Sequence, residues 1–248
     1  MGVLTLFGSV LSLALAPFVE FPAPAARPLL ALTIGLHTAY HLSLATAYDH
    51  GDLGQVYPIA RGSAPLLVAA GALAVAGERL GLLAAMGVLC LASGVMVLAL
   101  EHGSGMRRNP RAVTYALVTG ALIASYTVVD GLGVRRAGSV LGFAVWLTIG
   151  DGLLTFLVIS LWKGRQIVTV AKRSFPVALA GSAMQLAAYW IVLWALSAAP
   201  MASVSALRET SVLFAALMST FLLREGFGAW RFVSAVLVTL GLVATRMG

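Results

Sequence analysis

Nine apolar runs constrain this chain more than any other feature of its sequence. Each run has about 17–24 residues, and short polar breaks separate the runs. A helix needs about 20 apolar residues to cross a hydrocarbon core about 30 Å thick. The runs lack the two-residue alternation of a barrel strand, so helices are the structure that satisfies their backbone groups in lipid. The nine runs are 3–19, 29–48, 53–76, 81–100, 112–130, 139–162, 176–197, 201–223 and 229–246.

The composition supports this interpretation and excludes other classes of protein. Hydrophobic residues make up 60% of the 248 residues and charged residues only 10%, whereas soluble domains have about 45–50% and about 25%. A single cysteine, Cys90, excludes both a disulfide framework and a cysteine metal cage. The 16 Lys and Arg residues form no long cluster, so nucleic-acid binding is not expected. We therefore predict an all-α polytopic membrane protein.

The breaks between the runs are too short to hold a soluble domain. None exceeds about a dozen residues, so function is expected among the helices. The first run has an alternative interpretation as a signal peptide, because small residues after Phe21 weakly resemble a cleavage site. No basic region precedes that run, and we favour a membrane-spanning helix.

An internal repeat emerges when the chain is compared with itself. The shift in sequence that aligns the two copies corresponds to five runs. Because five is an odd number of helices, the two copies insert in opposite orientations. We expect an inverted-topology repeat with copies at residues 1–101 and 112–248. The fifth run has no counterpart, so we expect nine helices of a five-plus-five plan in which the first helix is absent. A shift of 147 residues aligns Arg61 with Arg208, Glu78 with Glu225, Gly81 with Gly228 and Gly94 with Gly241.

Three stretches of the sequence resemble a known family. Residues 47–69, AYDHGDLGQVYPIARGSAPLLVA, together with GERL at 77–80, resemble the first repeat of the EamA-type transporters of the drug/metabolite transporter superfamily. Residues 199–225 resemble the matching stretch of the second repeat, and residues 126–138 resemble the helix that opens it. The resemblance implies ten helices in two inverted bundles around a central cavity, and the export or exchange of small metabolites. It does not identify a substrate.

Two arginines, Arg61 and Arg208, lie well inside apolar runs at positions related by the repeat. An arginine at the centre of a bilayer costs about 2.5–3.5 kcal/mol on insertion scales, so it should face the bundle interior, a partner or water. One interpretation is binding of an anionic group or a gating ion pair. The other is structural, with side chains that reach the membrane surface. Glu209 follows Arg208 directly and either forms an internal ion pair or takes part in coupling.

A second set of polar residues consists of histidines and aspartates. His37 and His41 are four residues apart and share one face of a helix beside Tyr40. We favour imidazoles that line a polar cavity over a structural pair, and rank a metal site last, because no Asp or Glu lies on the same run. Asp151, between two glycines in the sixth run, is a candidate coupling residue. Asp130 is expected to be an exposed cap at the end of the fifth run.

Aromatic and amide side chains complete the candidate site. Their polar groups can line a substrate path, although tyrosine is also common at membrane surfaces. No catalytic residue, cofactor or metal ligand is predicted. The candidate coupling residue is Asp151, and the candidate substrate-binding residues are Arg208, Glu209, Arg61, His37, His41, Tyr40, Tyr57, Tyr126, Gln185 and Tyr189.

The sequence has no motif of a catalytic site or of a nucleotide-binding loop. We predict a secondary transporter in the inner cell membrane that exports or exchanges a small metabolite by alternating access, and that is not an enzyme. The alternative is a non-transporting scaffold or an accessory subunit of a membrane complex, and a membrane-embedded enzyme ranks third. The predicted partners are the lipid bilayer, a small metabolite that carries an anionic group, and a second copy of the chain in a homodimer.

The distribution of basic residues predicts the orientation of the chain. Nine lysines and arginines lie in breaks on the side of residue 1, and five lie on the opposite side. The positive-inside rule then places residue 1 in the cytoplasm and the C-terminus outside. The family resemblance implies a cytoplasmic C-terminus instead, and we follow the count of basic residues.

Overall fold

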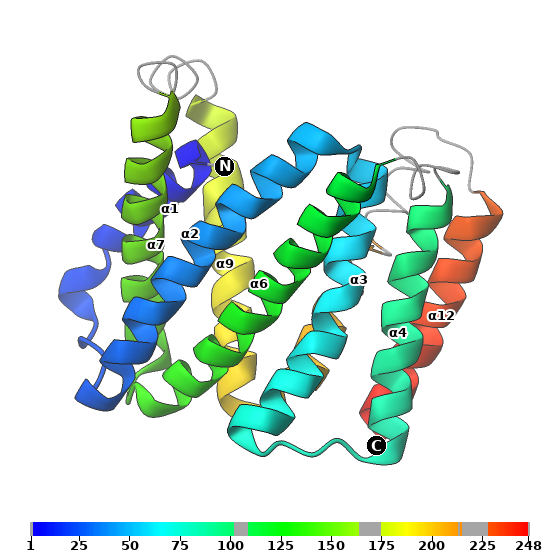
Figure 1. Ribbon diagram of the computed structural model, residues 1–248. Coiled ribbons are helices and arrows are strands. Elements are labelled where there is room, and N and C mark those ends of the chain that lie inside the picture. The colour runs from blue at the N-terminus through cyan, green and yellow to red at the C-terminus, as the bar shows by residue number, and fades with distance from the viewer. Residues whose placement is uncertain (1, 102–108, 164–174, 213, 215–227, 248) are drawn as a thin grey trace. The chain divides into compact units, whose positions relative to one another are not determined.

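The computed structural model describes residues 2–101, 109–163, 175–212, 214 and 228–247. Within these ranges every regular element is helical, so the all-α prediction is confirmed. Two 3-10 turns, Ala16–Phe18 and Pro24–Ala26, and a π-helical segment, Ala72–Ala76, are short. The α-helices are α1 (Gly2–Leu13), α2 (Arg27–His50), α3 (Leu53–Gly71), α4 (Leu82–Glu101), α6 (Pro110–Arg136), α7 (Val140–Lys163), α9 (Phe175–Ala198), α10 (Met201–Arg208) and α12 (Ala229–Met247) (Figure 1).

Seven of the described helices are long and apolar enough to cross a membrane. They correspond to seven of the nine predicted runs, and the prediction of a polytopic membrane protein is confirmed. The seven spans are Pro24–His50, Gly54–Ala76, Leu82–Ala99, Pro110–Arg136, Val140–Trp162, Phe175–Ala198 and Ala229–Met247.

The first predicted run forms a shorter helix than expected. Helix α1 has 12 residues, which at 1.5 Å per residue span about 18 Å, well short of a hydrocarbon core of about 30 Å. Pro17 explains the early end, because it has no N–H group to donate to the carbonyl of Leu13 four residues earlier. The chain turns there into the 3-10 segment Ala16–Phe18. The predicted helix of residues 3–19 is therefore corrected to α1.

The eighth predicted run is interrupted where its charged residues lie. Helix α10 ends at Arg208, and the following backbone N–H groups bond to carbonyls three residues back instead of four. The N–H of Val212 bonds in this way to the carbonyl of Glu209 at 3.0 Å, which frees the carbonyl of Arg208 for another donor. Most of the remaining run lies outside the described residues.

The chain forms two compact units, and each contains segments from both halves of the sequence. Unit 1 comprises Met1–His41 and Val129–Ala198, and unit 2 comprises Leu42–Val128 and Ala199–Gly248. The boundaries between the units fall inside α2 and α6. The predicted copies of the repeat divide the chain differently, along the sequence, and stay a prediction.

Glycines bring the helices of unit 1 close together around Asp151. On α7, a side chain at Gly150 would collide with Ile34 of α2, and a side chain at Gly152 would collide with the backbone of Thr5 in α1. Small residues at such contacts let helix backbones approach closely in a membrane. The two glycines that flank Asp151 therefore allow α1 and α2 to pack against the segment of α7 that carries it.

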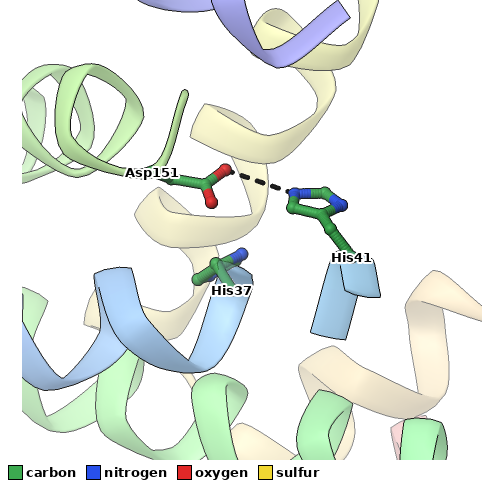
Figure 2. Close-up of side chains that lie close together, drawn as sticks. All are labelled: His37, His41 and Asp151. Atoms are coloured by element: carbon green, nitrogen blue, oxygen red, sulfur yellow. Dashed lines mark hydrogen bonds and ion pairs between the residues drawn. The ribbon is translucent and has the colours of Figure 1, made fainter. Parts of the chain in front are cut away.

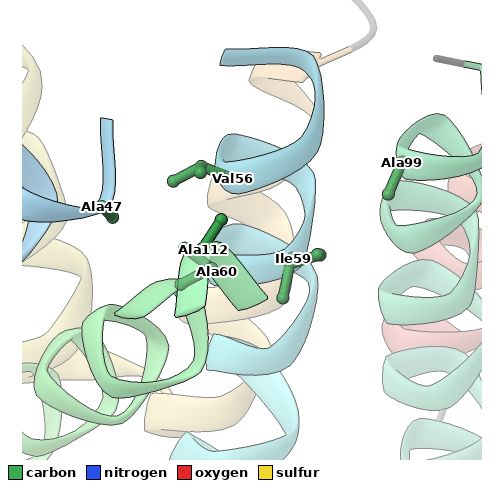
Figure 3. Packing of buried hydrophobic residues seen from close by; sticks show 7 residues of the cluster. Ala47, Val56, Ile59, Ala60, Ala99 and Ala112 are labelled. Atoms are coloured by element: carbon green, nitrogen blue, oxygen red, sulfur yellow. The ribbon is translucent and has the colours of Figure 1, made fainter. Parts of the chain in front are cut away.

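Unit 2 has a core of small apolar residues from α2, α3, α4 and α6. The packing continues where Gly120 of α6 lies against Ser63 of α3 and the carbonyl of Ala60. Close packing is important in lipid, because apolar lipid tails remove the hydrophobic driving force between helices. The core cluster in Figure 3 consists of Ala47, Val56, Ile59, Ala60, Ala99, Ala112 and Ala116.

Helices α4 and α12 of unit 2 lie side by side (Figure 1) and are joined by reciprocal glycine contacts. Gly94 lies against Val238, and Gly241 lies against Leu91. From Leu91 to Gly94 the residue number on α4 rises, whereas the contacted residue on α12 changes from Gly241 to Val238. The two helices are therefore antiparallel. Gly94 and Gly241 are related by the repeat shift of 147 residues, and so are Leu91 and Val238. Such reciprocity is expected of elements related by a two-fold axis, and it agrees with the repeat.

Two other contacts in unit 2 join residues 147 positions apart. The thiol of Cys90 donates a hydrogen bond to the carbonyl of Leu237 at 3.4 Å. A guanidinium nitrogen of Arg61 donates to the carbonyl of Arg208 at 3.5 Å. A residue near a two-fold axis meets its own counterpart, and both contacts have this form, while the repeat stays a prediction.

Glu78, another residue matched by the repeat, connects the break after α3 to α10. Its carboxylate accepts a hydrogen bond from the backbone N–H of Met201, the first residue of α10, at 2.8 Å. A carboxylate at this position is favourable, because the first N–H groups of a helix lack partners within the helix. Glu225, the predicted counterpart of Glu78, lies outside the described residues.

Candidate functional site

The structure gathers most of the predicted site residues into two clusters, one in each unit. Their assignment to substrate binding or coupling stays a prediction. We call His37, His41, Asp130 and Asp151 of unit 1 the imidazole–carboxylate cluster. We call Arg61, Arg208 and Glu209 of unit 2 the guanidinium cluster.

His41 of α2 and Asp151 of α7 form the first pair of the imidazole–carboxylate cluster. Nε2 of His41 lies 3.3 Å from Oδ2 of Asp151. Figure 2 shows the ring and the carboxylate facing one another, with His37 on the neighbouring turn of α2. Oδ1 of Asp151 accepts a hydrogen bond from the hydroxyl of Thr155, one turn further along α7, at 3.0 Å. Both oxygens of Asp151 therefore have partners, as a carboxylate inside a membrane-spanning helix requires.

His37 pairs with a second carboxylate, that of Asp130 on α6. Nε2 of His37 lies 3.1 Å from Oδ2 of Asp130. The hydroxyl of Thr33 donates to Oδ1 at 2.6 Å, and the hydroxyl of Tyr189 on α9 donates to Oδ2. Asp130 is fully buried, and these contacts connect α2, α6 and α9.

The burial of Asp130 corrects the expectation of an exposed cap. The fifth predicted helix ends at this residue, but α6 continues to Arg136. The helix ends just before Gly138, whose φ of 78° is the left-handed conformation that glycine adopts at helix ends. Asp130 therefore lies more than a full turn inside the helix, where side chains of α2 and α9 reach it.

Aromatic rings lie beside both imidazoles. The hydroxyl of Tyr189 is 3.2 Å from Nε2 of His37, and the two rings meet edge to face with centroids 5.3 Å apart. The ring of Tyr40 lies 5.0 Å from that of His41. Gln185, one turn before Tyr189 on α9, is exposed. Of the two candidates on α9, Tyr189 is the one that the described contacts join to the cluster.

Sequence reasoning did not anticipate that aspartates join the two histidines. It ranked a metal site last because the run that carries His37 and His41 has no carboxylate, yet Asp130 and Asp151 reach them from α6 and α7. A signal was present, since each aspartate is the sole acidic residue of its apolar run. An acidic residue in such a run needs a partner, but its identity depends on how the helices pack.

Arg61 of α3 forms a buried ion pair with Glu209, directly after α10. Nε of Arg61 donates to Oε2 of Glu209 at 2.9 Å, and Glu209 is 1% exposed. Nη2 donates to the carbonyl of Arg208 at 3.5 Å and to the hydroxyl of Ser211 at 3.4 Å. The half-exposed ring of Tyr57 lies 5.8 Å from the guanidinium carbon of Arg61. The guanidinium group therefore binds the turn at which α10 is interrupted.

Arg208 lies beside hydroxyl groups of α6. Its Nη2 is 3.3 Å from the hydroxyl of Tyr126, and its Nη1 is 3.5 Å from the hydroxyl of Thr127. Both hydroxyl-bearing residues are buried. The guanidinium cluster as defined contains two guanidinium groups and one carboxylate, so its formal charge is +1.

Apolar spans that carry buried charged and imidazole side chains define a polytopic membrane protein with polar sites inside its helical units. The model of the EamA-like transporter family matches residues 110–247, more than half of the chain. The chain therefore belongs to the EamA-like transporter family. No curated protein matches it. The family consists of membrane transporters and not of enzymes, which supports the general prediction of a multi-pass transporter in contact with a lipid bilayer.

Proposed function

We propose that this protein is a secondary transporter that exports or exchanges a small metabolite by alternating access, and that the metabolite carries a carboxylate or another anionic group. The observation that supports this most is the guanidinium cluster, in which two arginines and one glutamate lie within apolar runs. An arginine costs about 2.5–3.5 kcal/mol at a bilayer centre on insertion scales. A scaffold has little need of charged residues in its apolar runs, whereas a carrier of charged solutes needs them to bind its substrate.

The pair of Arg61 and Glu209 offers a switch for such a substrate. A guanidinium group can bind a carboxylate through two parallel N–H groups. An incoming carboxylate would compete with Glu209 for Arg61, and Arg208 would provide further donors nearby. Release of Glu209 would change the turn after α10, which Arg61 now binds through three residues. Alternating access needs elements of this kind with two arrangements.

Three further assignments belong to the same proposal. We place the protein in the inner cell membrane, we expect it to form a homodimer, and we retain Asp151 as a candidate coupling residue. These assignments rest on the sequence, and the guanidinium cluster supports none of them directly.

Flux measurements in proteoliposomes that contain the purified full chain test the proposal. A panel of radiolabelled mono- and dicarboxylates is screened first, and the best solute is then used with Arg61→Lys and Arg208→Lys. Lysine keeps the charge and loses the planar pair of donors, so we expect flux to fall at least about 10-fold, as for the loss of one charged hydrogen bond. Arg79→Lys is the matched control, because Arg79 is exposed in the break after α3, and its flux should not change.

Each other outcome has a definite meaning. Unchanged flux in both lysine variants, with folded protein, would exclude bidentate recognition by the guanidinium cluster. Flux of neutral or cationic solutes without flux of any carboxylate would overturn the anionic substrate. Absence of flux for every class of solute would favour the alternative of a scaffold or an accessory subunit.

A further inference from the structure

We propose that His37, His41 and Asp151 bind one divalent transition-metal ion within unit 1, and that Asp130 orients His37 for this purpose. The nearest imidazole nitrogens and carboxylate oxygen of the three residues all lie within 4.8 Å of one another. They come from α2 and α7, and Figure 2 shows them together in one place. The proposal concerns binding by unit 1 and does not depend on the function proposed above.

The spacing of these side chains is close to that of a coordination sphere. Two ligand atoms that are each about 2.0 Å from a tetrahedral zinc ion are about 3.3 Å apart. Nε2 of His41 and Oδ2 of Asp151 are already 3.3 Å apart. His37 and His41 lie one helical turn apart on the same face of α2, so a small rotation of side chains brings the third ligand into range.

His41 carries a buried nitrogen for which the described residues provide no partner. Its Nδ1 atom forms no hydrogen bond among the described residues, although the side chain is only 5% exposed. A buried polar atom without a partner is unfavourable, because it has lost its hydrogen bonds to water. An ion bound directly at Nδ1 would give this atom a partner, whereas an ion bound at Nε2 would leave Nδ1 as the N–H group of the ring. Nδ1 is therefore a second candidate ligand atom of His41, besides Nε2.

A supporting layer of hydrogen bonds holds the three ligands in place. Oδ2 of Asp130 lies 3.1 Å from Nε2 of His37, and the hydroxyl of Thr33 donates to Oδ1 of Asp130 at 2.6 Å. Thr155 donates to Asp151 at 3.0 Å. Histidine ligands of metals usually have a carboxylate or carbonyl on their other nitrogen, which fixes the orientation of the ring. The same role for Asp130 explains why this carboxylate is fully buried beside His37.

The charge and the donor types select the class of ion. Two aspartates beside two neutral imidazoles carry a formal charge of −2, which one divalent cation balances. Nitrogen donors are typical of zinc and other first-row transition metals, whereas calcium and magnesium prefer oxygen ligands alone. Three protein ligands leave a further position open, as in zinc sites that bind water or a solute. The competing arrangement is a pair of imidazole–carboxylate contacts that bind no metal, and in the part of the chain that the structure describes it leaves Nδ1 of His41 without a partner.

Calorimetric titration of the purified, tag-free full chain in detergent with Zn²⁺ alone tests the site. We expect one ion per chain, and a fall in affinity of at least about 10-fold in His41→Gln and in Asp151→Asn, since even the loss of a supporting residue has this effect. His50→Gln is the matched control on the same helix, where His50 binds the carbonyl of Thr46. Binding to the control should equal that of the unaltered protein. Equal affinity in all variants, or no binding to the unaltered chain, would overturn the site.

A second measurement covers the case in which the ligand variants do not fold. X-ray absorption of the unaltered chain loaded with one Zn²⁺ should show two imidazole ligands, with distances of about 2.0–2.1 Å between the zinc ion and the imidazole nitrogens. Fewer than two imidazoles would overturn the proposal. Both measurements record binding alone, so a failure of metabolite flux leaves them unaffected, and an absence of Zn²⁺ binding leaves the proposed transport function intact.

Discussion

Glu209 offers a direct way to measure the buried ion pair, because glutamine has almost the same size. Glu209→Gln leaves Arg61 in place without its carboxylate, and breaking a buried pair from one side costs about 3–5 kcal/mol. The side chain of Arg61 is 16% exposed, so water offsets part of the cost, and we expect a loss of about 3 kcal/mol in the free energy of unfolding. Unfolding by SDS in mixed micelles measures this loss.

Removal of both charges tests whether the broken ion pair causes the loss of stability. Arg61→Met combined with Glu209→Leu should recover most of the lost stability, because apolar residues of similar size often replace a buried pair at little cost. Glu20→Gln, at an exposed glutamate, should have no effect. A double variant as unstable as Glu209→Gln would show that the ion pair is not the origin of the loss.

Tyr189 tests the packing of α9 against the imidazole–carboxylate cluster. Tyr189→Phe removes the hydroxyl that donates to the buried carboxylate of Asp130, and we expect a loss of about 1–3 kcal/mol in the free energy of unfolding. Tyr115→Phe is the matched control, since the Tyr115 hydroxyl has no hydrogen bond among the described contacts and its ring lies beside His50. Equal losses in the two variants would contradict the importance of the hydroxyl at Asp130.

The contact between α4 and α12 depends on glycines at two positions related by the repeat. A Cβ atom at Gly241 would lie 2.6 Å from the backbone nitrogen of Leu91, and one at Gly94 would lie 2.9 Å from side-chain atoms of α12. We therefore expect Gly241→Ala and Gly94→Ala each to cost about 1–3 kcal/mol in the free energy of unfolding. The two losses should be similar, because the two contacts are reciprocal.

Gly35 of α2 provides the comparison for these glycines. A Cβ atom there would meet nothing within 4 Å, and alanine favours a helix over glycine by about 1 kcal/mol. Gly35→Ala should therefore leave the free energy of unfolding unchanged or raise it. Destabilisation at Gly35 equal to that at Gly94 and Gly241 would mean that close helix contact does not explain the effect.

Each compact unit needs both halves of the chain, and this has a consequence for fragments. Residues 1–101 contain α1 and most of α2 from unit 1, together with α3 and α4 from unit 2. The partners of these helices, α7, α9 and α12, lie in the second half. We expect that neither 1–101 nor 109–248 folds alone, because each exposes the helix faces that the other covers, and that co-expression restores a stable complex.

Size-exclusion chromatography and protease resistance of the separately expressed and co-expressed halves check this expectation. A control split within the break between α7 and α9 separates α7 from α9 and should also need co-expression, because both helices belong to unit 1. A half that is monodisperse and protease-resistant on its own would contradict the mixed composition of the units.

The orientation of the chain stays a prediction, since most of the basic residues on the side of residue 1 lie outside the described residues.

Hydropathy was sufficient to predict the class of fold, for a local reason. A segment in lipid must satisfy its backbone hydrogen bonds within itself, so a long apolar run becomes a helix whatever its neighbours are. Seven of the nine runs are accordingly described as spans. Helix ends were predicted less well. Pro17 shortens α1, a signal that the sequence contained, but the end of α10 at Arg208 coincides with a contact from Arg61 on another helix.

Composition and position likewise indicated which residues matter, but not how they pair. A charged residue in an apolar run must find a partner, and the residues that this rule selected, Arg61, Asp151 and Glu209, each have an ion-pair partner in the structure. Spacing rules act only within one helix, where residues three or four apart share a face. The pairs seen here join residues 93, 110 and 148 positions apart. Such pairs depend on which helices pack together, and glycines at several contacts between helices far apart in sequence leave room for that packing.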